Sequence, residues 1–486
     1  MNTELLKLKP EIVWKNFVEL TKIPRPSKKE EAIRKFMKKW ADERGLENFE
    51  DEIGNVIVKK PATKGMENRK GIILQGHLDM VPQKNNDTEH DFEKDPITAY
   101  VDGDWVTAKG TTLGADNGMG VAAAMAVLES NDIEHGPIEV LMTIDEETGM
   151  TGAFNLKAGI LEGDILMNLD SEDEGELYIG CAGGIDLTAT FKYKDKKVPK
   201  DSVAIKLTVT GLKGGHSGVD IPLQRGNANK IIFRLLEKAA KKYKAKLASI
   251  SGGDMRNAIP REAVAIITVP KNKLEKFNKF VKNFEELILS EIKAVDEGFK
   301  IVVEEVELPK SVIDNKVAKK LYKAINAVPH GALRFIDGMN DVPETSTNLG
   351  IVKSEKGKIM VANLIRSSSD SAKSHLADAM KGLFKLAGAK VKLHGEYPGW
   401  KPNFESPILA AMKKSYNEKY GKIPEVKIIH AGLECGVLGA TYKNWDMISF
   451  GPTIRFPHSP DEKVHIESVG KFWDFLLETL KNAPVK

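Results

Sequence analysis

The chain has 486 residues, 41% of them hydrophobic and 29% charged, and a formal net charge of +3. This composition is typical of a soluble globular protein, and the length favours two or more domains. No basic tract is mixed with aromatic residues, so we do not expect nucleic acid as a partner. No segment resembles a secretory signal or a membrane span, and the two cysteines, Cys181 and Cys435, form no metal pattern. We therefore expect a cytoplasmic protein that does not bind membranes.

The first part of the chain alternates between expected helices and expected strands. Helical periodicity covers 11–44 and is interrupted by prolines at 24–27. A short strand is expected at 55–58. A continuous apolar run at 72–74 then predicts a central strand that is buried on both faces. Residues 82–110 form a polar loop with a hairpin turn at 102–104.

Two polar residues, His77 and Asp79, follow the buried strand. In extended chain they point to the same side, since they are two residues apart. A neutral imidazole is a good zinc ligand, and a nearby carboxylate can fix its tautomer. The alternative is a hydrogen-bonded histidine beside a solvated aspartate, and this tripeptide alone does not decide between them.

A glycine-rich segment, 110–120, leads into a helix of small residues. It lacks the lysine and serine or threonine of a phosphate-binding P-loop and the spacing of a dinucleotide fingerprint. Its chemically active residue is Asp116 at the helix entrance. Taken alone, Asp116 is better explained as the N-cap of that helix.

Two further apolar strands, 138–144 and 165–169, end in acidic residues. The first leads into Asp145, Glu146 and Glu147, and the second into Asp170. Adjacent carboxylates repel one another, and a dication would remove that cost. The alternative for the triplet is an exposed acidic turn. Because the carboxyl ends of parallel strands meet at one edge of a sheet, we expect a single site there.

The hydrophobic pattern of the sequence changes after 183–184, from continuous apolar runs to alternating residues. We interpret 186–395 as an inserted domain of alternating, antiparallel-type strands and helices, with a pattern compatible with two successive α+β units. Its expected helices lie at 226–241, 271–293 and 373–386, and its expected strands at 263–269, 302–308 and 359–365. The first sheet then resumes with a helix at 405–419, a strand at 426–430, a final strand at 448–452, a loop that carries His458, and a helix at 466–481.

Six motifs, in chain order, resemble the M20 family of metallopeptidases, and within it the aminoacyl-histidine dipeptidases. They are GHLDMV, GTTLGADNGMG, DEETGMTGA, LDSE, GGHSG and PHSPDE. The resemblance covers essentially the whole chain. It implies an α/β fold, in which 1–185 and 396–486 form a zinc-peptidase α/β/α sandwich and 186–395 forms an inserted α+β lid domain.

The resemblance also implies a site with two Zn²⁺ ions, for which Co²⁺ or Mn²⁺ could substitute. Its implied metal ligands are His77 and Asp170 for one ion, Glu147 and His458 for the other, and Asp116 as the bridge. Glu146 is the implied general base, Asp79 the residue that orients His77, and a cis peptide bond is expected between Asp116 and Asn117. In the lid, His216, Asn257 and Arg366 match positions that contact substrate, and Glu434 is a further candidate substrate-binding residue. We expect a homodimer, in which His216 could act in its own subunit or in its partner.

The chemistry of these residue types agrees with the resemblance. Two metals about 3.5–4 Å apart need a bridging carboxylate such as Asp116. Nitrogen and oxygen ligands without thiolate suit zinc, cobalt or manganese. Glu146 would move a proton from water to the leaving amine, and His216 would help to stabilise the oxyanion. Arg366 would bind a substrate carboxylate, unless it forms a surface ion pair with a neighbour such as Asp370.

Three functions are compatible with these residues. The main prediction is a dinuclear zinc dipeptidase whose substrates include Xaa-His dipeptides such as carnosine. An N-acyl amino acid amidase would use the same metals but would not require a free α-amino group in its substrate. A metal-dependent peptide-binding protein without turnover would need a broken base or ligand, and none of the implied positions is broken.

Overall fold

The computed structural model describes residues 4–486, which divide into two compact units. The first unit runs up to Gly180 and also includes Trp400–Ile428 and Leu433–Lys486. The second unit comprises Cys181–Gly399 and the short segment Ile429–Gly432. The predicted inserted domain, 186–395, lies inside this second unit.

The first unit is built on an eight-stranded sheet in the order β1-β2-β6-β3-β7-β23-β8-β22. The neighbours β6, β3, β7 and β23 run parallel, whereas the β1–β2, β2–β6 and β23–β8 pairs are antiparallel. Every residue of β3 and β6 is buried, which explains their continuous apolar runs. The strands are β1 (Glu47–Glu50), β2 (Val56–Lys60), β3 (Ile72–His77), β6 (Ile138–Thr143), β7 (Ile165–Asn168), β8 (Glu176–Cys181), β22 (Glu425–Ile429) and β23 (Asp446–Ser449).

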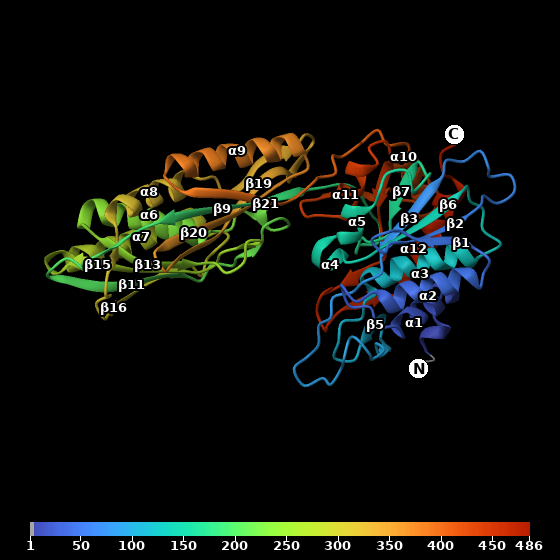
Figure 1. Ribbon diagram of the computed structural model, residues 1–486, viewed down its shortest axis with the longest axis horizontal. Coiled ribbons are helices and arrows are strands. Elements are labelled where there is room, and N and C mark those ends of the chain that lie inside the picture. The colour runs from blue at the N-terminus through green and yellow to red at the C-terminus, as the bar shows by residue number, and fades with distance from the viewer. Residues whose placement is uncertain (1–3) are drawn as a thin grey trace. The chain divides into compact units, whose positions relative to one another are not determined.

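Helices lie on both faces of this sheet (Figure 1). Helix α3 packs on β3 and on α1, while α10 packs on β23 and on α12. The helices are α1 (Glu11–Thr21), α2 (Glu31–Asp42), α3 (Ala115–Glu129), α4 (Glu146–Gly149), α5 (Thr151–Asn155), α10 (Pro407–Tyr420), α11 (Glu434–Thr441) and α12 (Ile466–Lys481). A smaller sheet has the order β24-β25-β5-β4, with β4 at Ala99–Asp102, β5 at Trp105–Ala108, β24 at Ile454–Arg455 and β25 at Lys463–His465. No helix among residues 4–486 combines the length and apolar character needed to cross a bilayer.

The second unit is an antiparallel sheet in the order β16-β11-β15-β13-β19-β20-β9-β21, with β18 paired to β19. Two-stranded pairings join β10 to β17 and β12 to β14. The strands are β9 (Gly183–Lys192), β10 (Asp195–Lys196), β11 (Ser202–Thr210), β12 (Gly215–His216), β13 (Lys246–Gly252), β14 (Ala258–Ile259), β15 (Ala263–Pro270), β16 (Lys300–Val306), β17 (Val312–Ile313), β18 (Gly331–Ile336), β19 (Met339–Glu355), β20 (Lys358–Ser367) and β21 (Lys390–Tyr397).

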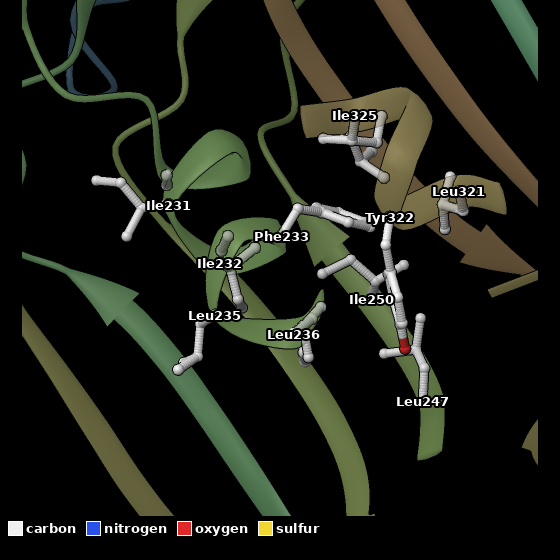
Figure 2. Close-up of a cluster of buried hydrophobic side chains, with 14 of the residues drawn as sticks. Ile231, Ile232, Phe233, Leu235, Leu236, Leu247, Ile250, Leu321, Tyr322 and Ile325 are labelled. Carbon is white, nitrogen blue, oxygen red and sulfur yellow. The ribbon is translucent and has the colours of Figure 1, made fainter. Parts of the chain in front are cut away.

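Four helices of this unit, α6 (Ala228–Tyr243), α7 (Leu274–Ile292), α8 (Asn315–Ala327) and α9 (Asp370–Leu386), pack on its sheet. Strand β9 alternates between buried Ile185, Leu187, Ala189 and Phe191 and less buried polar residues, as expected for a sheet with one covered face. Figure 2 shows this core where α6 and α8 meet β13, with Phe233 beside Tyr322. The unit therefore has a hydrophobic core of its own.

The structure confirms most of the predicted elements, including the hairpin turn at 102–104 and the helix at 466–481. The expectation that 448–452 is the final strand is wrong, because the short strands β24 and β25 follow it. Several elements of the second unit were not predicted, among them the strands β13, β18 and β21, the helix α8 and the 17-residue strand β19. Strand β19 contains Pro343 and several polar residues, which conceal its periodicity.

Candidate metal centre and active site

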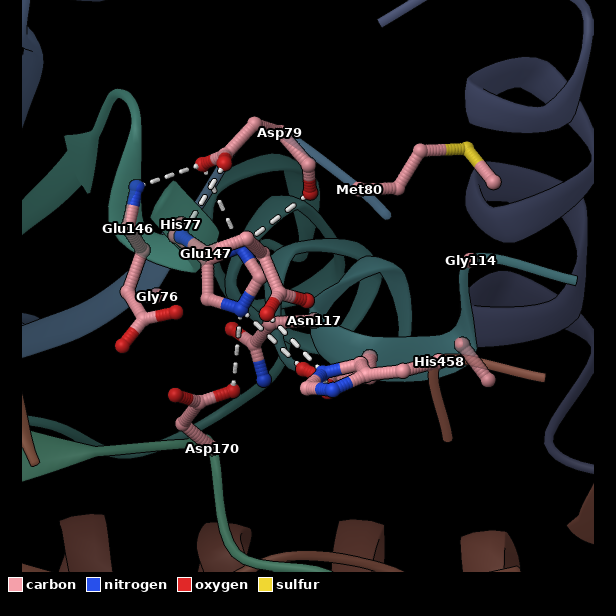
Figure 3. A network of polar contacts seen from close by, with 12 residues as sticks. Gly76, His77, Asp79, Met80, Gly114, Asn117, Glu146, Glu147, Asp170 and His458 are labelled. Atoms are coloured by element: carbon pink, nitrogen blue, oxygen red, sulfur yellow. Dashed lines mark hydrogen bonds and ion pairs between the residues drawn. The ribbon is translucent and has the colours of Figure 1, made fainter. Parts of the chain in front are cut away.

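Two groups of metal-ligand side chains lie at one end of the large sheet and share Asp116. His77 is the last residue of β3, Asp170 lies two residues beyond β7, and Asp116 is near the start of α3. His77 Nε2 lies 3.0 Å from Asp116 Oδ1 and 3.4 Å from Asp170 Oδ1. On the other side, His458 Nε2 lies 3.2 Å from Asp116 Oδ2 and 2.8 Å from Glu147 Oε2. The two oxygens of Asp116 thus face different histidines, as a bridging carboxylate requires. Figure 3 shows His77, Glu147, Asp170 and His458 gathered in one network.

The donor atoms within each group are close enough to hold one cation. Those of His77, Asp116 and Asp170 lie within 4.8 Å of one another, as do those of Asp116, Glu147 and His458. Two of the oxygens, Glu147 Oε1 and Asp170 Oδ1, are buried and have no hydrogen-bond partner among residues 4–486. Buried carboxylate oxygens normally find a donor or a metal. The side chains therefore fit two divalent cations with nitrogen and oxygen ligands.

The pKa values of these groups also indicate that the site stabilises positive charge. Burial alone would lower the pKa of His77, but Asp170, Asp116 and Asp79 outweigh burial and raise it well above the usual value. Hydrogen bonds to Asp116 and Glu147 raise the pKa of His458 to about 11. Burial raises the pKa of Asp170 to about 7, although His77 opposes the shift. Without a metal, these side chains therefore bind protons, and a bound dication would displace those protons.

Asp79 contacts both His77 and the turn that carries the two glutamates. Its carboxylate accepts hydrogen bonds from the backbone N–H groups of Glu146 (3.0 Å) and Glu147 (3.2 Å), and from Ser27 Oγ (2.8 Å). His77 Nδ1 lies 3.1 Å from the backbone carbonyl oxygen of Asp79 and 3.4 Å from its carboxylate. Asp79 therefore fixes the start of α4 as well as the ring of His77.

Glu146 and Glu147 point in different directions, as expected for neighbours at the start of a helix. Glu147 faces His458, whereas the carboxylate of Glu146 makes no hydrogen bond to another described residue. Burial raises the pKa of Glu146 well above its usual value, and Asp170 contributes in the same direction. A buried carboxylate that readily holds a proton has the property required of a general base and acid.

The loop before α3 is held by a buried acid and a buried base. The carboxylate of Glu462 accepts the backbone N–H groups of residues 113–116 at 2.7–3.2 Å. The guanidinium of Arg25 donates to the carbonyl oxygens of Gly114, Leu78 and Asp79. A Cβ on Gly114, which has a φ of +70°, would lie 2.6 Å from Arg25 Nη2, so only glycine fits there. The predicted cis peptide bond between Asp116 and Asn117 is confirmed.

Within the second unit, His216 and Asn257 lie on neighbouring strand segments, and the charge of Arg366 acts on His216. His216 pairs with Ala258 across β12 and β14, next to Asn257. His216 Nδ1 accepts backbone N–H bonds from Gly218 and Val219, both 3.2 Å long. The proton of the neutral ring is therefore on Nε2, which can donate to a substrate oxygen. Burial and the charge of Arg366 lower the pKa of His216 and so favour the neutral ring.

Arg366 is 6% exposed and forms no ion pair with any residue in 4–486. Its Nη1 donates to the hydroxyl of Tyr397 at 2.8 Å, and its Nε has no partner among the described residues. The alternative partner, Asp370, instead accepts from Lys373 and from the backbone N–H of Gly399. A buried guanidinium without a carboxylate can bind an anionic group of a ligand.

The sequence matches the model of peptidase family M20/M25/M40 over residues 73–482. The chain belongs to this family. It is 46% identical over 484 residues, all of both chains, to the cytosol non-specific dipeptidase of Escherichia coli strain K12. The structure matches the crystal structure of aminoacylhistidine dipeptidase from Vibrio alginolyticus with a TM-score of 0.94 and 49% identity, covering 99% of this chain and 98% of that one. The aminopeptidase PepT structure from Bacillus cereus matches at a TM-score of 0.56 and 19% identity over 98% and 99% of the two chains, and shows the shared fold alone.

This family membership confirms the predicted α/β fold with a catalytic and an inserted lid domain, and the chain is a metallopeptidase. Arg25 and Glu462 were not among the residues predicted to belong to the site. Glu462 lies in the PHSPDE motif, four residues after His458, which is the only local signal that it belongs to the site. Glu434 is 1% exposed and accepts hydrogen bonds from Gln75 and Thr143, so its side chain is buried against β3 and β6.

Proposed function

We propose that this chain is a dipeptidase that holds two divalent cations, zinc being the expected metal, and hydrolyses dipeptides that include Xaa-His sequences. The observation that carries the proposal is the position of Asp116, whose two oxygens face His77 and His458. The names of the two full-length relatives, a non-specific dipeptidase and an aminoacylhistidine dipeptidase, support the choice of substrate. The name of the first also supports a cytoplasmic location.

The proposed cation ligands are the five side chains that form the two groups, namely His77, Asp116, Glu147, Asp170 and His458. When bound, two such cations would polarise the scissile carbonyl and make water acidic enough to attack near neutral pH. Asp79 keeps His77 and the Glu146–Glu147 turn in place through the contacts described above.

Glu146 is the proposed general base. Its carboxylate makes no hydrogen bond to the described residues, so it is free to accept one from a water. Glu146 would take a proton from the attacking water and pass it to the nitrogen of the leaving amino acid. The raised pKa of Glu146 suits both steps, since the same group must accept the proton and then release it.

The lid residues would bind the rest of the substrate. His216 offers an Nε2–H donor to the developing oxyanion, Arg366 offers a guanidinium to the terminal carboxylate, and Asn257 is the neighbour of His216. The proposal requires the second unit to approach the first, in the same subunit or in a homodimer. The segments near 183–184 and 395–399 are the proposed hinges.

A substrate panel tests the proposal. The purified protein is assayed with dipeptides, tripeptides and N-acetylated dipeptides, each with and without a C-terminal histidine. A dipeptidase hydrolyses free dipeptides, with carnosine among the substrates, and rejects the N-acetylated forms. Turnover of the N-acetylated forms alone would favour an N-acyl amino acid amidase, and no turnover with cations bound would favour a binding protein.

A further inference from the structure

Four strands of the large sheet each carry a buried, uncharged polar side chain at or near their carboxyl ends. They are Gln75 in β3, Thr143 in β6, Asn168 in β7 and Ser449 in β23, and none of them is more than 1% exposed. In register, Asn168 lies between Gln75 and Ser449. Polar groups in such a position cost free energy unless they are hydrogen-bonded.

These side chains form one continuous chain of hydrogen bonds across the sheet. Ser449 Oγ donates to Asn168 Oδ1 at 2.5 Å, Asn168 Nδ2 donates to Gln75 Oε1 at 2.6 Å, and Gln75 Nε2 donates to Glu434 Oε2 at 2.6 Å. Thr143 Oγ1 donates to the same oxygen of Glu434 at 2.7 Å. Every donor in the chain therefore points toward Glu434.

The direction of this chain depends on Glu434. Its Oε2 can only accept from Gln75, so the Gln75 amide must turn its Oε1 toward Asn168. The Asn168 amide must then turn its Oδ1 toward Ser449. One carboxylate at the first position of α11 thus sets the orientation of two buried amides and of the Thr143 hydroxyl.

Three of these four strands, β3, β7 and β6, deliver a proposed cation ligand just beyond the polar residue. His77 comes two residues after Gln75, Asp170 two residues after Asn168, and Glu147 four residues after Thr143. We propose that Glu434 is a positioning residue, which fixes the spacing of these three strand ends and so the geometry of the cation site. The inference rests on the proposed function, because it assumes that the site holds cations.

The structure favours this role over direct contact with substrate. The side chain of Glu434 is 1% exposed, and its second oxygen, Oε1, is buried without a hydrogen-bond partner among the described residues. The other oxygen, Oε2, accepts hydrogen bonds from Gln75 in β3 and Thr143 in β6, and neither of these residues is a proposed cation ligand. Outer residues that orient metal ligands typically contribute 10- to 100-fold to metal affinity.

The test is a cobalt titration of metal-free protein, followed by the visible absorbance of bound Co²⁺, which reports both affinity and coordination geometry. Glu434→Met keeps a side chain of similar length but removes the acceptor. We expect it to weaken Co²⁺ binding about 10- to 100-fold and to change the spectrum. Glu434→Gln retains one oxygen that can accept both bonds, and we expect its affinity to stay within about threefold of the wild type.

Glu139→Met is the matched control. Glu139 is a 6% exposed acid in β6 that also accepts two hydrogen bonds, from the backbone N–H groups of Glu162 and Gly163, but it lies at the start of the strand. It should lose thermal stability while its Co²⁺ spectrum stays unchanged. If Glu139→Met weakens Co²⁺ binding as much as Glu434→Met does, the effect is general destabilisation and the inference is wrong.

Thr143→Val provides a second test that does not depend on the folding of Glu434→Met. Valine has the shape of threonine without the hydroxyl, so one of the two bonds to Glu434 is lost. We expect Co²⁺ affinity to fall about three- to tenfold, and the loss to be smaller when Glu434 is already methionine. Wild-type affinity and spectrum in Thr143→Val would overturn the inference.

Two outcomes separate this inference from the function on which it rests. If the wild-type protein binds no Co²⁺, the proposed function itself fails. If it binds two ions and Glu434→Met binds them equally well, only the positioning role is wrong. A raised KM in Glu434→Gln with unchanged Co²⁺ affinity would instead assign Glu434 to the substrate and would also overturn the inference.

Discussion

Glu146 and Glu147 are adjacent and chemically identical, yet the structure predicts different consequences for changing each of them. In Glu146→Gln, no hydrogen bond of the carboxylate is lost, because it makes none to the described residues, and the backbone bond to Asp79 is unaffected. Burial and the neighbouring carboxylates of Asp170 and Glu147 disfavour a negative charge on Glu146, so a neutral amide is tolerated there. We therefore expect the folded protein to lose no more than about 0.5 kcal/mol of stability.

The activity of Glu146→Gln should nevertheless fall sharply. A positioned general base typically contributes a factor of about 10²–10⁴ to the rate, which corresponds to about 2.7–5.4 kcal/mol of activation free energy. We expect this loss in kcat, with metal content unchanged. Glu147→Gln differs, because it alters the carboxylate whose Oε2 lies 2.8 Å from His458 Nε2 and replaces a charged metal ligand with a neutral amide. We expect this variant to bind the metal at least about 100-fold more weakly.

The assay compares metal stoichiometry, by elemental analysis, and kcat for both variants and the wild type. Glu162→Gln is the control, because Glu162 is an 83% exposed acid of the same unit that forms only a surface ion pair with Lys59. If Glu146→Gln loses metal while Glu147→Gln keeps it, the two roles are reversed. If Glu146→Gln retains full activity, the proposed mechanism is wrong.

Three further predictions follow from the site and the lid. Glu462→Gln keeps one acceptor oxygen for four N–H donors, so about two charge-assisted bonds of about 1.5–3 kcal/mol each are lost. Calorimetry of the metal-free protein should therefore show a lower melting temperature for Glu462→Gln than for the exposed control Asp461→Asn. Zinc affinity, measured by competition titration, should rise with pH between about 6 and 8, because binding displaces protons from His77 and His458, whose pKa values are raised; a flat profile would contradict this. His216→Ala should lower kcat without changing metal content, and unaltered turnover would show that His216 is structural.

Three of the proposed cation ligands, His77, Glu147 and Asp170, could be placed together from the sequence, because each follows an apolar strand and parallel strands end at one edge of a sheet. Asp116 begins a helix of small residues, and only the resemblance to a family made it a bridging ligand. His458 was different. It lies in a loop more than 280 residues further along the chain, and only the PHSPDE motif and its resemblance to a family connected it to the site.

The residues that support the site could not be found in the same way. Gln75 and Asn168 are single polar residues in apolar strands, and their function depends on the register of neighbouring strands and on Glu434 from another helix. Arg25 and Glu462 hold the loop before α3 from two distant segments. Such contacts are set by three-dimensional packing, and no local periodicity or spacing predicts them.

The hydrogen bonds of the acidic residues separate supporting acids from candidate ligands. A separate acidic cluster, Glu30, Asp79 and Asp145, also has the spacing of a cation site and is buried. However, its oxygens already have donors: Asp79 accepts three hydrogen bonds, Glu30 accepts the backbone N–H groups of Lys28 and Asp145, and Asp145 accepts two threonine hydroxyls. A cation there would have to displace these donors, so we infer that this cluster is structural.

The acids of the proposed metal centre show the opposite pattern. Glu147 Oε1 and Asp170 Oδ1 have no hydrogen-bond donor among the described residues, and the carboxylate of Glu146 has none either. Burying such oxygens without a hydrogen bond costs free energy. The nearby backbone N–H groups instead donate to acids such as Asp79 and Glu462. The fold therefore keeps the donors for the acids that position the site and leaves the remaining acids open to cations, water and substrate.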